Sequence, residues 1–491
     1  MAEPPPVHDV AIVGAGFGGL GMAIRLRRSG RSFVVLEKAD RVGGTWRENT
    51  YPGAGCDVPS HLYSFSFHPG SWPRRYSGQA DILRYLEDLV TAYGLAPHLR
   101  LGAEVTAAAF DAAAGVWRVT LAGGEVVAAR AVVSSVGQLN RPAVPDIPGH
   151  DRFHGRSWHT AHWQHDCSLD GRRVAVIGTG ASAIQLVPEL APRVARLHVF
   201  QRSAPYVVAK PDRAYGPVAR ALYGHAPLLR RADRLRVFLT GELLGAALVA
   251  SPRLRRMLEG QWRSFMESQV PDPALRTRCT PDYEMGCKRI LFSNDWYPAL
   301  QRPNVELVTD AIDDITEDAI NTADGAHRQV DAILYATGFR ATDFLQPMRV
   351  TGLGGRDLHE TWRNGAEAYW GVVVSGFPNF FMLYGPNTNL GSNSIIYMLE
   401  AQIGYVDRAL SAMRRGRLRW LDVRAEAQGE FNRWVEARSG RTVWETGCHS
   451  WYTTGGRNTN NWPTFPFRYR RQLRRFDLRD YVAEPDLAPL A

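Results

Sequence analysis

Cysteine is scarce in this chain of 491 residues, and its few cysteines form no recognisable pattern. Their number is odd, they are scattered, and no two are spaced as C-x-x-C. The sequence therefore gives no support for a disulfide framework or a zinc site, and it favours a reducing, cytoplasmic environment. The five positions are Cys56, Cys167, Cys279, Cys287 and Cys448.

Long hydrophobic runs are also missing. Residues 1–9, MAEPPPVHD, are rich in proline and lack the apolar stretch of a signal peptide. The most apolar segment, VFLTGELLGAALVA (237–250), is too short to span a bilayer and contains Glu242. We expect no integral membrane segment, and we interpret 237–250 as a buried helix, with shallow contact with a membrane surface as the alternative.

Negative charge is in deficit, because 58 lysines and arginines stand against 49 acidic residues. Basic runs at 230–236 (RRADRLR) and 468–475 (RYRRQLRR) are compatible with nucleic acid or an anionic membrane. Solvated helix faces explain them more simply, and a positive cleft would also suit a phosphate-rich cofactor. We expect no nucleic-acid partner. The length predicts two or three lobes, since it exceeds what one core usually serves.

Two copies of one glycine-rich turn stand out from this background. Residues 9–19 (DVAIVGAGFGG) and 173–183 (RVAVIGTGASA) each run from an apolar strand through G-x-G-x-x-G/A into a helix. In each copy the first glycine permits a tight turn, the second admits a pyrophosphate, and the third small residue lets the helix lie on its strand. Two such turns predict two nucleotide sites, built on Gly14, Gly16 and Gly19 and on Gly178, Gly180 and Ala183.

The strand that follows each turn indicates which nucleotide binds. Glu37 lies 23 residues after Gly14, and Gln201 lies 23 residues after Gly178 and is followed by Arg202. A carboxylate accepts hydrogen bonds from ribose hydroxyls, whereas a neutral residue beside arginine suits a 2′-phosphate. The first site therefore fits FAD or NAD and the second fits NADPH. Because two nicotinamides would leave no electron sink between them, the pair FAD and NADPH is favoured.

The order of these signals predicts an α/β chain with two Rossmann-like dinucleotide-binding domains, for FAD and for NADPH. We expect residues 1–142 to be the first part of the FAD-binding domain, because 137–149 (GQLNRPAVPDIPG) resembles a crossing between lobes. Residues 143–340 would be the NADPH-binding domain, with a helical insertion at about 212–275 and a buried strand in DAILYATGF (331–339). Residues 341–491 would return to the FAD-binding domain and end in a C-terminal mobile loop.

Two longer motifs resemble those of the class B flavoprotein monooxygenases of the Baeyer–Villiger type, a likeness that covers nearly the whole chain. One is FHGRSWHTAHW (153–163), which matches F-x-G-x-x-x-H-x-x-x-W. The other is GGTWRENTYPGAGCD (43–57), and ATGF (336–339) is a further shared element. One departure is Gln164, where the family usually has Pro or Asp. The matching residues are Phe153, Gly155, His159 and Trp163, and Gly43, Gly44, Trp46, Tyr51, Pro52, Gly53 and Asp57.

The resemblance implies an FAD- and NADPH-dependent enzyme that inserts one oxygen atom of O₂ beside a ketone carbonyl, through a C4a-peroxyflavin, to give an ester or lactone. The segment MGCKRILFSNDWYPAL (285–300) matches the family segment that carries an active-site arginine, which implies a catalytic role for Arg289. Arginine stays charged and does not readily protonate a peroxide. Asp57 would position Arg289. His159 and Trp163 would belong to the linker that couples the two nucleotide lobes, without a metal.

The resemblance also implies cofactor contacts. Around FAD it places Gly14, Gly16, Phe17, Gly19, Glu37, Gly44, Thr45, Trp46, Asp57, Tyr63 and Val105. Around NADPH it places Gly178, Thr179, Gly180, Ala181, Ser182, Gln185, Arg202, Lys288 and the mobile-loop residue Trp451.

Three other functions remain open from the sequence. An N- or S-oxygenating flavin-containing monooxygenase would use the same cofactors, although Trp163 and Arg289 favour the Baeyer–Villiger type. A disulfide-type flavin reductase would need a cysteine pair, and Cys56 has no partner nearby in sequence. A nucleotide-binding sensor without catalysis is the third. The identity of the ketone and the oligomeric state cannot be read from the sequence.

Overall fold

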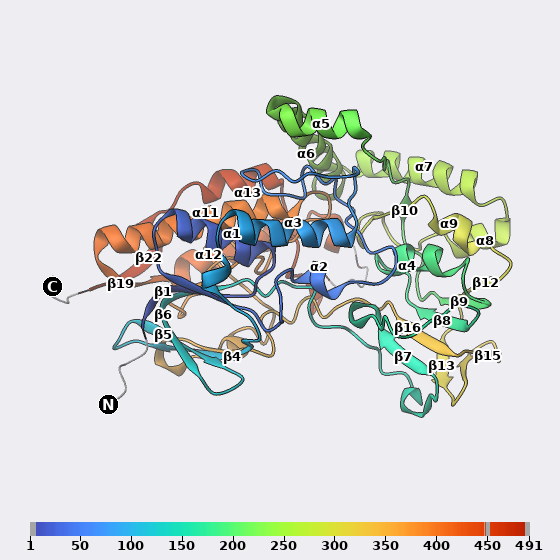
Figure 1. The fold of residues 1–491 in the computed structure, drawn as a ribbon, viewed down its shortest axis with the longest axis horizontal. Coiled ribbons are helices and arrows are strands. Elements are labelled where there is room, and N and C mark those ends of the chain that lie inside the picture. The colour runs from blue at the N-terminus through green and yellow to red at the C-terminus, as the bar shows by residue number, and fades with distance from the viewer. Residues whose placement is uncertain (1–5, 446, 448–451, 487–491) are drawn as a thin grey trace.

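Two α/β lobes lie side by side in the computed structural model, which describes residues 6–445, 447 and 452–486. One lobe is built around an eight-stranded sheet and the other around a five-stranded sheet (Figure 1). A group of helices projects from the top of the molecule in the same view. The α/β class predicted from the sequence is therefore confirmed.

The sheet of the first lobe has the order β17-β4-β5-β6-β1-β2-β3, and β18 also pairs with β6. Its central strand β1 contains Val10, Ala11 and Ile12, which are fully buried because both faces of the sheet are covered. The strands are β1 (His8–Val13), β2 (Phe33–Leu36), β3 (Leu99–Arg100), β4 (Val105–Asp111), β5 (Val116–Leu121), β6 (Val126–Ser134), β17 (Arg349–Thr351) and β18 (Phe380–Met382).

Helices from both ends of the chain cover this sheet. The long helix α11 packs against α1, which follows the first glycine turn, and against α13 near the C-terminus. The helices are α1 (Phe17–Arg28), α2 (Thr45–Glu48), α3 (Gln79–Ala92), α10 (Leu358–Thr361), α11 (Ile395–Gly416), α12 (Ala425–Ser439) and α13 (Pro466–Leu473). The short strands β19 (Leu418–Val423) and β22 (Tyr481–Pro485) pair beside them, as do β20 (Thr453–Thr454) and β21 (Arg457–Asn458).

The second lobe has a parallel sheet in the order β12-β9-β8-β16-β7. Its strands are β7 (Arg156–His159), β8 (Arg173–Ile177), β9 (Arg196–Phe200), β12 (Val305–Val308) and β16 (Ala332–Tyr335), with helices α4 (Ala183–Leu190) and α9 (Trp296–Leu300). A small antiparallel sheet, β13 (Ile312–Ile315), β14 (Ala319–Thr322) and β15 (His327–Gln329), and the pair β10 (Val207–Val208) and β11 (Leu291–Phe292) complete it.

The projecting helices correct one expectation. They are α5 (Pro217–His225), α6 (Pro227–Val249) and α7 (Pro252–Gln269), and the short helix α8 (Pro273–Arg278) follows them in the chain. The segment 237–250 was expected to be a buried helix, yet Leu239 and Leu243 in α6 are 56% and 63% exposed. The apolar residues of α6 are distributed around its whole circumference. Only the side that carries Val237 and Leu248 packs against the rest of the protein, so the apolar residues on its other sides are exposed.

The cysteines differ from expectation at one position. Cys56, Cys167 and Cys279 are free thiols, whereas Cys287 is disulfide-bonded. The number and spacing of the cysteines, which gave no support for a disulfide framework, therefore did not predict the bond at Cys287. Cys448 lies outside the described residues.

Candidate active site

A cavity of about 1430 Å³ lies where the carboxyl ends of the strands of the two lobes face each other. It is lined from the first lobe by residues that follow β1, β2 and β6, and from the second by residues that follow β8, β9 and β16. The carboxyl edge of an open α/β sheet is where such folds bind ligands. The volume exceeds the roughly 300–1,000 Å³ usual for one small-molecule site, so the cavity has room for more than one ligand.

The first glycine turn is built so that side chains would obstruct it. Gly14 has φ +100°, and a Cβ there would lie 2.6 Å from the carbonyl oxygen of Ser135. A Cβ at Gly19 would lie 1.9 Å from the carbonyl oxygen of Gly14, so α1 touches the turn. No side chain caps α1 at Gly16. Its first backbone N–H groups are therefore available to an anion in the cavity, as a pyrophosphate requires.

Glu37 is buried at the end of β2 and braces this turn. Its Oε2 accepts a hydrogen bond from the backbone N–H of Ala15 (2.7 Å), and its Oε1 accepts one from Ala39 (3.0 Å). A carboxylate has about four acceptor sites, so two remain for ribose hydroxyls. The residue predicted to contact a ribose therefore also fixes the backbone beside the phosphate position.

The second turn repeats this construction. Gly178 has φ +107°, and a Cβ there would lie 2.6 Å from the carbonyl oxygen of Ala336. Nothing lies within 4 Å of a Cβ placed on Gly180, so the backbone at that position is open. Ser182 precedes α4 without capping it through its side chain. Thr179 donates its hydroxyl to the carbonyl of Ser203 (3.2 Å), which ties the turn to the segment after β9.

Two cations gather beside the second turn. Lys288 donates to the hydroxyl of Ser203 (2.8 Å) and lies 4.4 Å above the ring of Tyr283. Burial, followed by the positive charge of Arg202, lowers the pKa of Lys288. Like charges held close together are favourable once an anion lies between them. Gln201, the neutral residue before Arg202, is buried and donates to the carbonyl of Arg278 (2.7 Å).

Gln185 links the two lobes. Its side-chain oxygen accepts hydrogen bonds from the hydroxyl of Tyr51 (2.9 Å) and the N–H of Gly55 (3.4 Å), and its amide donates to the carbonyl of Gly55 (3.0 Å). A Cβ at Gly53 would lie 2.5 Å from the carbonyl of Gln185, so the backbones approach closely. The amide of Gln185 lines the cavity but is engaged by residues 51–55 of the first lobe.

A bidentate ion pair lies in the cavity wall. The Nε of Arg289 contacts Oδ2 of Asp57 (3.0 Å), and its Nη2 contacts Oδ1 (2.8 Å) and Oδ2 (2.7 Å). The negative charge of Asp57 raises the pKa of Arg289 above its usual range. Tyr452 is buried nearby and Tyr384 is part-buried, and burial raises the pKa of Tyr452 to about 12 against the opposing effect of Arg289. Arg289 is thus a permanent cation among neutral hydroxyls.

Three aromatic side chains, Phe17, Trp46 and Tyr63, also line the cavity. Phe17 and Tyr63 meet edge to face with ring centroids 5.2 Å apart, and the indole N–H of Trp46 donates to the hydroxyl of Tyr63 (3.1 Å). The cavity is also lined by Gly44, Thr45 and Val105. These rings give one end of the cavity an apolar surface of the kind that a flat ring system packs against.

His159 and Trp163 do not line the cavity. His159 is buried at the end of β7, where its Nδ1 accepts from the N–H of Ala161 (3.1 Å) and its ring meets Phe339 edge to face. Burial lowers the pKa of His159 to about 4. Phe339 does line the cavity, so His159 touches the site through it. The ring of Trp163 packs on that of Trp158.

Other predicted residues are placed as follows. Ala181, Ser182, Arg202 and Lys288 line the cavity, as do Gly14, Gly16, Gly178, Thr179 and Gly180. Gly19 lies behind the turn and Trp451 lies outside the described residues. Within the described part of the chain, no group of His, Cys, Asp and Glu could hold a metal ion.

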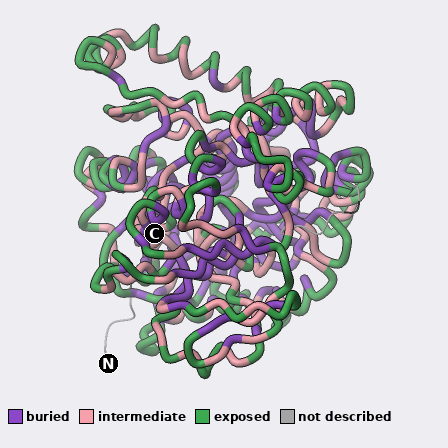
Figure 2. The backbone as a smooth tube through the Cα atoms, turned by 90° about the vertical axis from the view of Figure 1, so that its right-hand side faces the viewer, coloured by how far each residue is buried: buried purple, intermediate pink, exposed green. Residues whose placement is uncertain are grey.

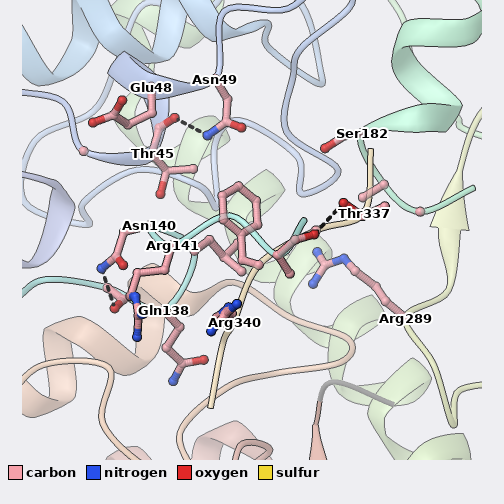
Figure 3. Close-up of a pocket in the computed structure, with 18 of the residues that line it drawn as sticks. Thr45, Glu48, Asn49, Gln138, Asn140, Arg141, Ser182, Arg289, Thr337 and Arg340 are labelled. Atoms are coloured by element: carbon pink, nitrogen blue, oxygen red, sulfur yellow. Dashed lines mark hydrogen bonds between the residues drawn. The ribbon is translucent and has the colours of Figure 1, made fainter. Parts of the chain in front are cut away.

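Sequence reasoning missed part of the wall. Tyr384, Asn389 and Asn393 line the cavity from the segment between β18 and α11, and the Tyr384 hydroxyl donates to Oδ1 of Asn389 (2.5 Å). Arg141 and Arg340 line it from the two crossings between lobes (Figure 3). The composition of the loop GPNTNLGSN (385–393) predicts a turn, but nothing in its sequence indicates that it lines the cavity.

Comparisons with known proteins agree with this architecture. The pyridine nucleotide-disulphide oxidoreductase family matches residues 11–216, which include both glycine turns. A Baeyer–Villiger monooxygenase of Streptomyces coelicolor is 46% identical over 98% of this chain and 94% of its own length. An oxidised steroid monooxygenase bound to NADP has a TM-score of 0.87 and 31% identity, covering 98% of this chain and 100% of that one. OTEMO in complex with FAD and NADP has a TM-score of 0.86 and 27% identity, covering 96% and 97%.

This chain therefore belongs to the Baeyer–Villiger monooxygenases, the class that its fold and its sequence motifs indicated. It is an NADPH-dependent flavin monooxygenase with FAD as its flavin. Disulfide-reductase chemistry is not supported, because Cys56 is the only described cysteine that lines the cavity. Burial raises the pKa of its thiol, which opposes the formation of a reactive thiolate.

Proposed function

We propose that this enzyme converts a ketone into an ester or lactone at the Arg289–Asp57 pair. One oxygen atom of O₂ enters the bond between the carbonyl carbon and its neighbour, the other leaves as water, and NADPH supplies two electrons. The observation that carries the proposal is the bidentate pair in the wall of a cavity shared by both glycine turns.

The structure fits both cofactors. Gly14, Gly16 and Glu37 would hold FAD, with its ring system against Phe17, Trp46 and Tyr63. Further contacts would come from Gly44, Thr45 and Val105. The turn at 178–182 would hold the pyrophosphate of NADPH, and Arg202 with Lys288 would hold its 2′-phosphate. When bound, FAD supplies the activation of O₂ that amino-acid side chains cannot provide.

Arg289 would act on the ketone. Its charge is fixed by Asp57 and does not depend on pH in the working range. Placed beside the carbonyl oxygen, it would stabilise the negative charge that develops there as the carbonyl carbon becomes tetrahedral. Asp57 is a positioning residue that holds the guanidinium plane. The hydroxyls of Tyr384 and Tyr452, whose pKa values are raised by desolvation, stay protonated and keep the surroundings of Arg289 polar without adding charge.

The domain arrangement belongs to the same proposal. Residues 1–142 and 341–491 would form the FAD-binding domain and 143–340 the NADPH-binding domain. His159 and Trp163 would couple their motions, with His159 acting through Phe339. Trp451 would close on NADPH. We further propose a cytoplasmic location, where NADPH is available.

A panel of ketones tests this function. Purified holoenzyme is incubated with NADPH, O₂ and cyclic, linear and steroidal ketones, and the product masses are recorded beside an amine and a thioether. We expect a gain of one oxygen in ketone products that hydrolyse to a carboxylic acid and an alcohol. Oxygenation of only the amine or thioether would contradict the proposal and support N- or S-oxygenation.

A further inference from the structure

The outer face of α5 and α6 is apolar and has no partner within the described chain. Leu228, Leu235, Leu239 and Leu243 follow each other at i, i+7, i+11 and i+15, which places them on one side of α6. They are 75%, 56%, 56% and 63% exposed. Val218 and Leu222 of α5 add 74% and 50% exposed side chains beside them. We call these six residues the leucine face. Clustered exposure of this kind marks an interaction site.

The helix is not loosely attached, so the exposure is not a sign of fraying. Its inner residue Arg234 donates from Nη1 to the carbonyls of His61 (2.7 Å) and Ser64 (2.8 Å). The neighbouring Asp233 accepts from Nδ1 of His61 (2.8 Å), and this hydrogen bond lowers the pKa of Asp233 to about 2. α6 is therefore fixed on the protein by one side while its leucines point away. Figure 2 shows this region standing above the body, with mainly exposed residues.

The exposed charged side chains around the leucine face are all positive. Residues 217–257 contain eight arginines and two acidic residues, Asp233 and Glu242, both part-buried. Arg231 and Arg236 lie on opposite sides of the α6 leucines, since they are offset from Leu235 by four residues back and one forward. The exposed arginines of this stretch are Arg220, Arg231, Arg236, Arg253 and Arg256.

We propose that the leucine face docks on the surface of an anionic lipid bilayer, with the leucines among the acyl chains and the arginines at the phosphates. Helices of this composition lie in the interface plane and are attracted by negative headgroups. Two copies of the chain meeting through this face would instead bring five exposed arginines against five like charges. The charge pattern therefore favours lipid over self-association.

The docked enzyme remains peripheral. Within the described residues, no single helix is long and apolar enough to cross a membrane. Helices α6 and α7 meet that length and composition only as a pair, and they bend by 109° at their junction. A bend of this size, together with the inner contacts of Arg234, keeps the pair on the protein. The leucine face thus contacts one leaflet.

The opposite side of α6 contacts the wall of the cavity. The side-chain amide of Asn393, which lines the cavity, donates to the carbonyl of Phe238 (3.3 Å). A Cβ at Gly241 would lie 2.8 Å from the carbonyl of Ser392, so the helix backbone touches that loop. Docking would therefore hold the substrate cavity near a reservoir of apolar compounds. The proposal concerns location and goes beyond the reaction proposed above.

Vesicle flotation of the holoenzyme tests docking. We expect binding to vesicles that contain about one-quarter phosphatidylglycerol in phosphatidylcholine, weaker binding to phosphatidylcholine alone, and weakening by salt at about 0.5 M. The triple variant L235S/L239S/L243S should lose at least about ten-fold in bound fraction, since each leucine buries apolar surface. Reversing charge with R220E/R231E/R256E should abolish the preference for phosphatidylglycerol.

Matched controls separate docking from damage to the fold. L101S/V126S/L478S removes three other exposed apolar side chains, 42%, 38% and 45% exposed, that lie outside the leucine face, and should bind vesicles as the parent does. All variants should retain FAD and the turnover of a small water-soluble ketone, so loss of docking is distinguishable from loss of catalysis. Unchanged vesicle binding by the leucine variant would overturn the proposal. So would a dimer in light scattering that the leucine variant dissociates while the parent binds no vesicles.

Discussion

Arg289 and Asp57 meet in a bidentate ion pair although 232 positions separate them in the chain. Asp57 follows the segment after α2 in the first lobe, and Arg289 precedes β11 in the second. Because each lobe contributes one partner, the ion pair forms only when the lobes are docked. Gln185, which bonds to Tyr51 and Gly55, holds the same interface a short distance away.

Replacing Arg289 should separate the two halves of the reaction. In Arg289→Ala the cavity loses the cation that is paired with Asp57, and product formation should fall by about 10²–10³-fold, the usual cost of a donor that stabilises developing negative charge. Reduction of FAD by NADPH should persist, because the nucleotide turns are untouched. Anaerobic stopped-flow absorbance measures reduction and product mass measures oxygenation. Arg289→Lys keeps the positive charge but loses the bidentate geometry of the guanidinium. Its rate of product formation should therefore lie between those of the parent and Arg289→Ala. Parent-like product yield from Arg289→Ala would contradict the assignment.

Asp57 and Arg289 should behave as one unit. Asp57→Ala leaves the guanidinium without its carboxylate, so we expect a loss of product formation within about ten-fold of that in Arg289→Ala. The double variant should be no worse than the more impaired single variant, because residues that act together show non-additive losses. The measurement is a double-mutant cycle: the rates of product formation of the parent, the two single variants and the double variant. Additive losses would show that the residues act independently.

Nucleotide preference should depend on Arg202 and Lys288. A charge-assisted hydrogen bond to phosphate is worth about 1.5–3 kcal/mol, so Arg202→Ala or Lys288→Ala should raise KM for NADPH about 10- to 100-fold. KM for NADH, which lacks the 2′-phosphate, should change little. Arg193→Ala is the matched control, since it removes an exposed arginine of the same lobe that pairs with Asp170. An equal rise in KM for NADPH and NADH would contradict the assignment, because it would mean that Arg202 and Lys288 do not bind the 2′-phosphate.

Local requirements explain what could be predicted from the sequence. Gly14 and Gly178 have positive φ and abut a carbonyl oxygen, so only glycine fits, and such a requirement is visible in a short motif. Glu37 could be located because strand length fixes its distance from the turn. Two copies of this unit were sufficient to predict the α/β class and the pair of cofactors.

Contacts between distant segments explain what could not be predicted. Tyr384 reaches the cavity with φ +66°, a conformation that is unfavourable for a side chain and that no local pattern announces. The engagement of Gln185 by the first lobe depends on how the lobes dock. Which apolar residues of α6 are exposed depends on which side of the helix packs against the protein. The sequence is equally apolar on the buried and the exposed sides, so it does not distinguish them. Each of these properties is set by tertiary placement.

Acid should destabilise the folded enzyme through the protonation of His159. Burial holds its pKa at about 4, below the value of about 6.5 in the unfolded chain. Between these values the unfolded state binds a proton that the folded state excludes. The contribution of neutral His159 to the free energy of unfolding is therefore fully present above about pH 6.5, and it is lost as the pH falls toward 4. With solvent screening allowed for, we expect about 2 kcal/mol of unfolding free energy to depend on this group.

His159→Gln removes the titrating ring and should flatten this dependence. Urea unfolding at pH 7 and pH 4.5 gives the change in unfolding free energy for each protein, and the parent should lose about 2 kcal/mol more than the variant. His154→Gln, which changes an exposed histidine of the same segment, should follow the parent. If His159 also couples the lobes through Phe339, His159→Gln should slow FAD reduction by NADPH at pH 7.5, where the pH effect on stability is absent. An equal fall in stability for parent and variant would contradict this prediction, because it would mean that folding does not change the pKa of His159.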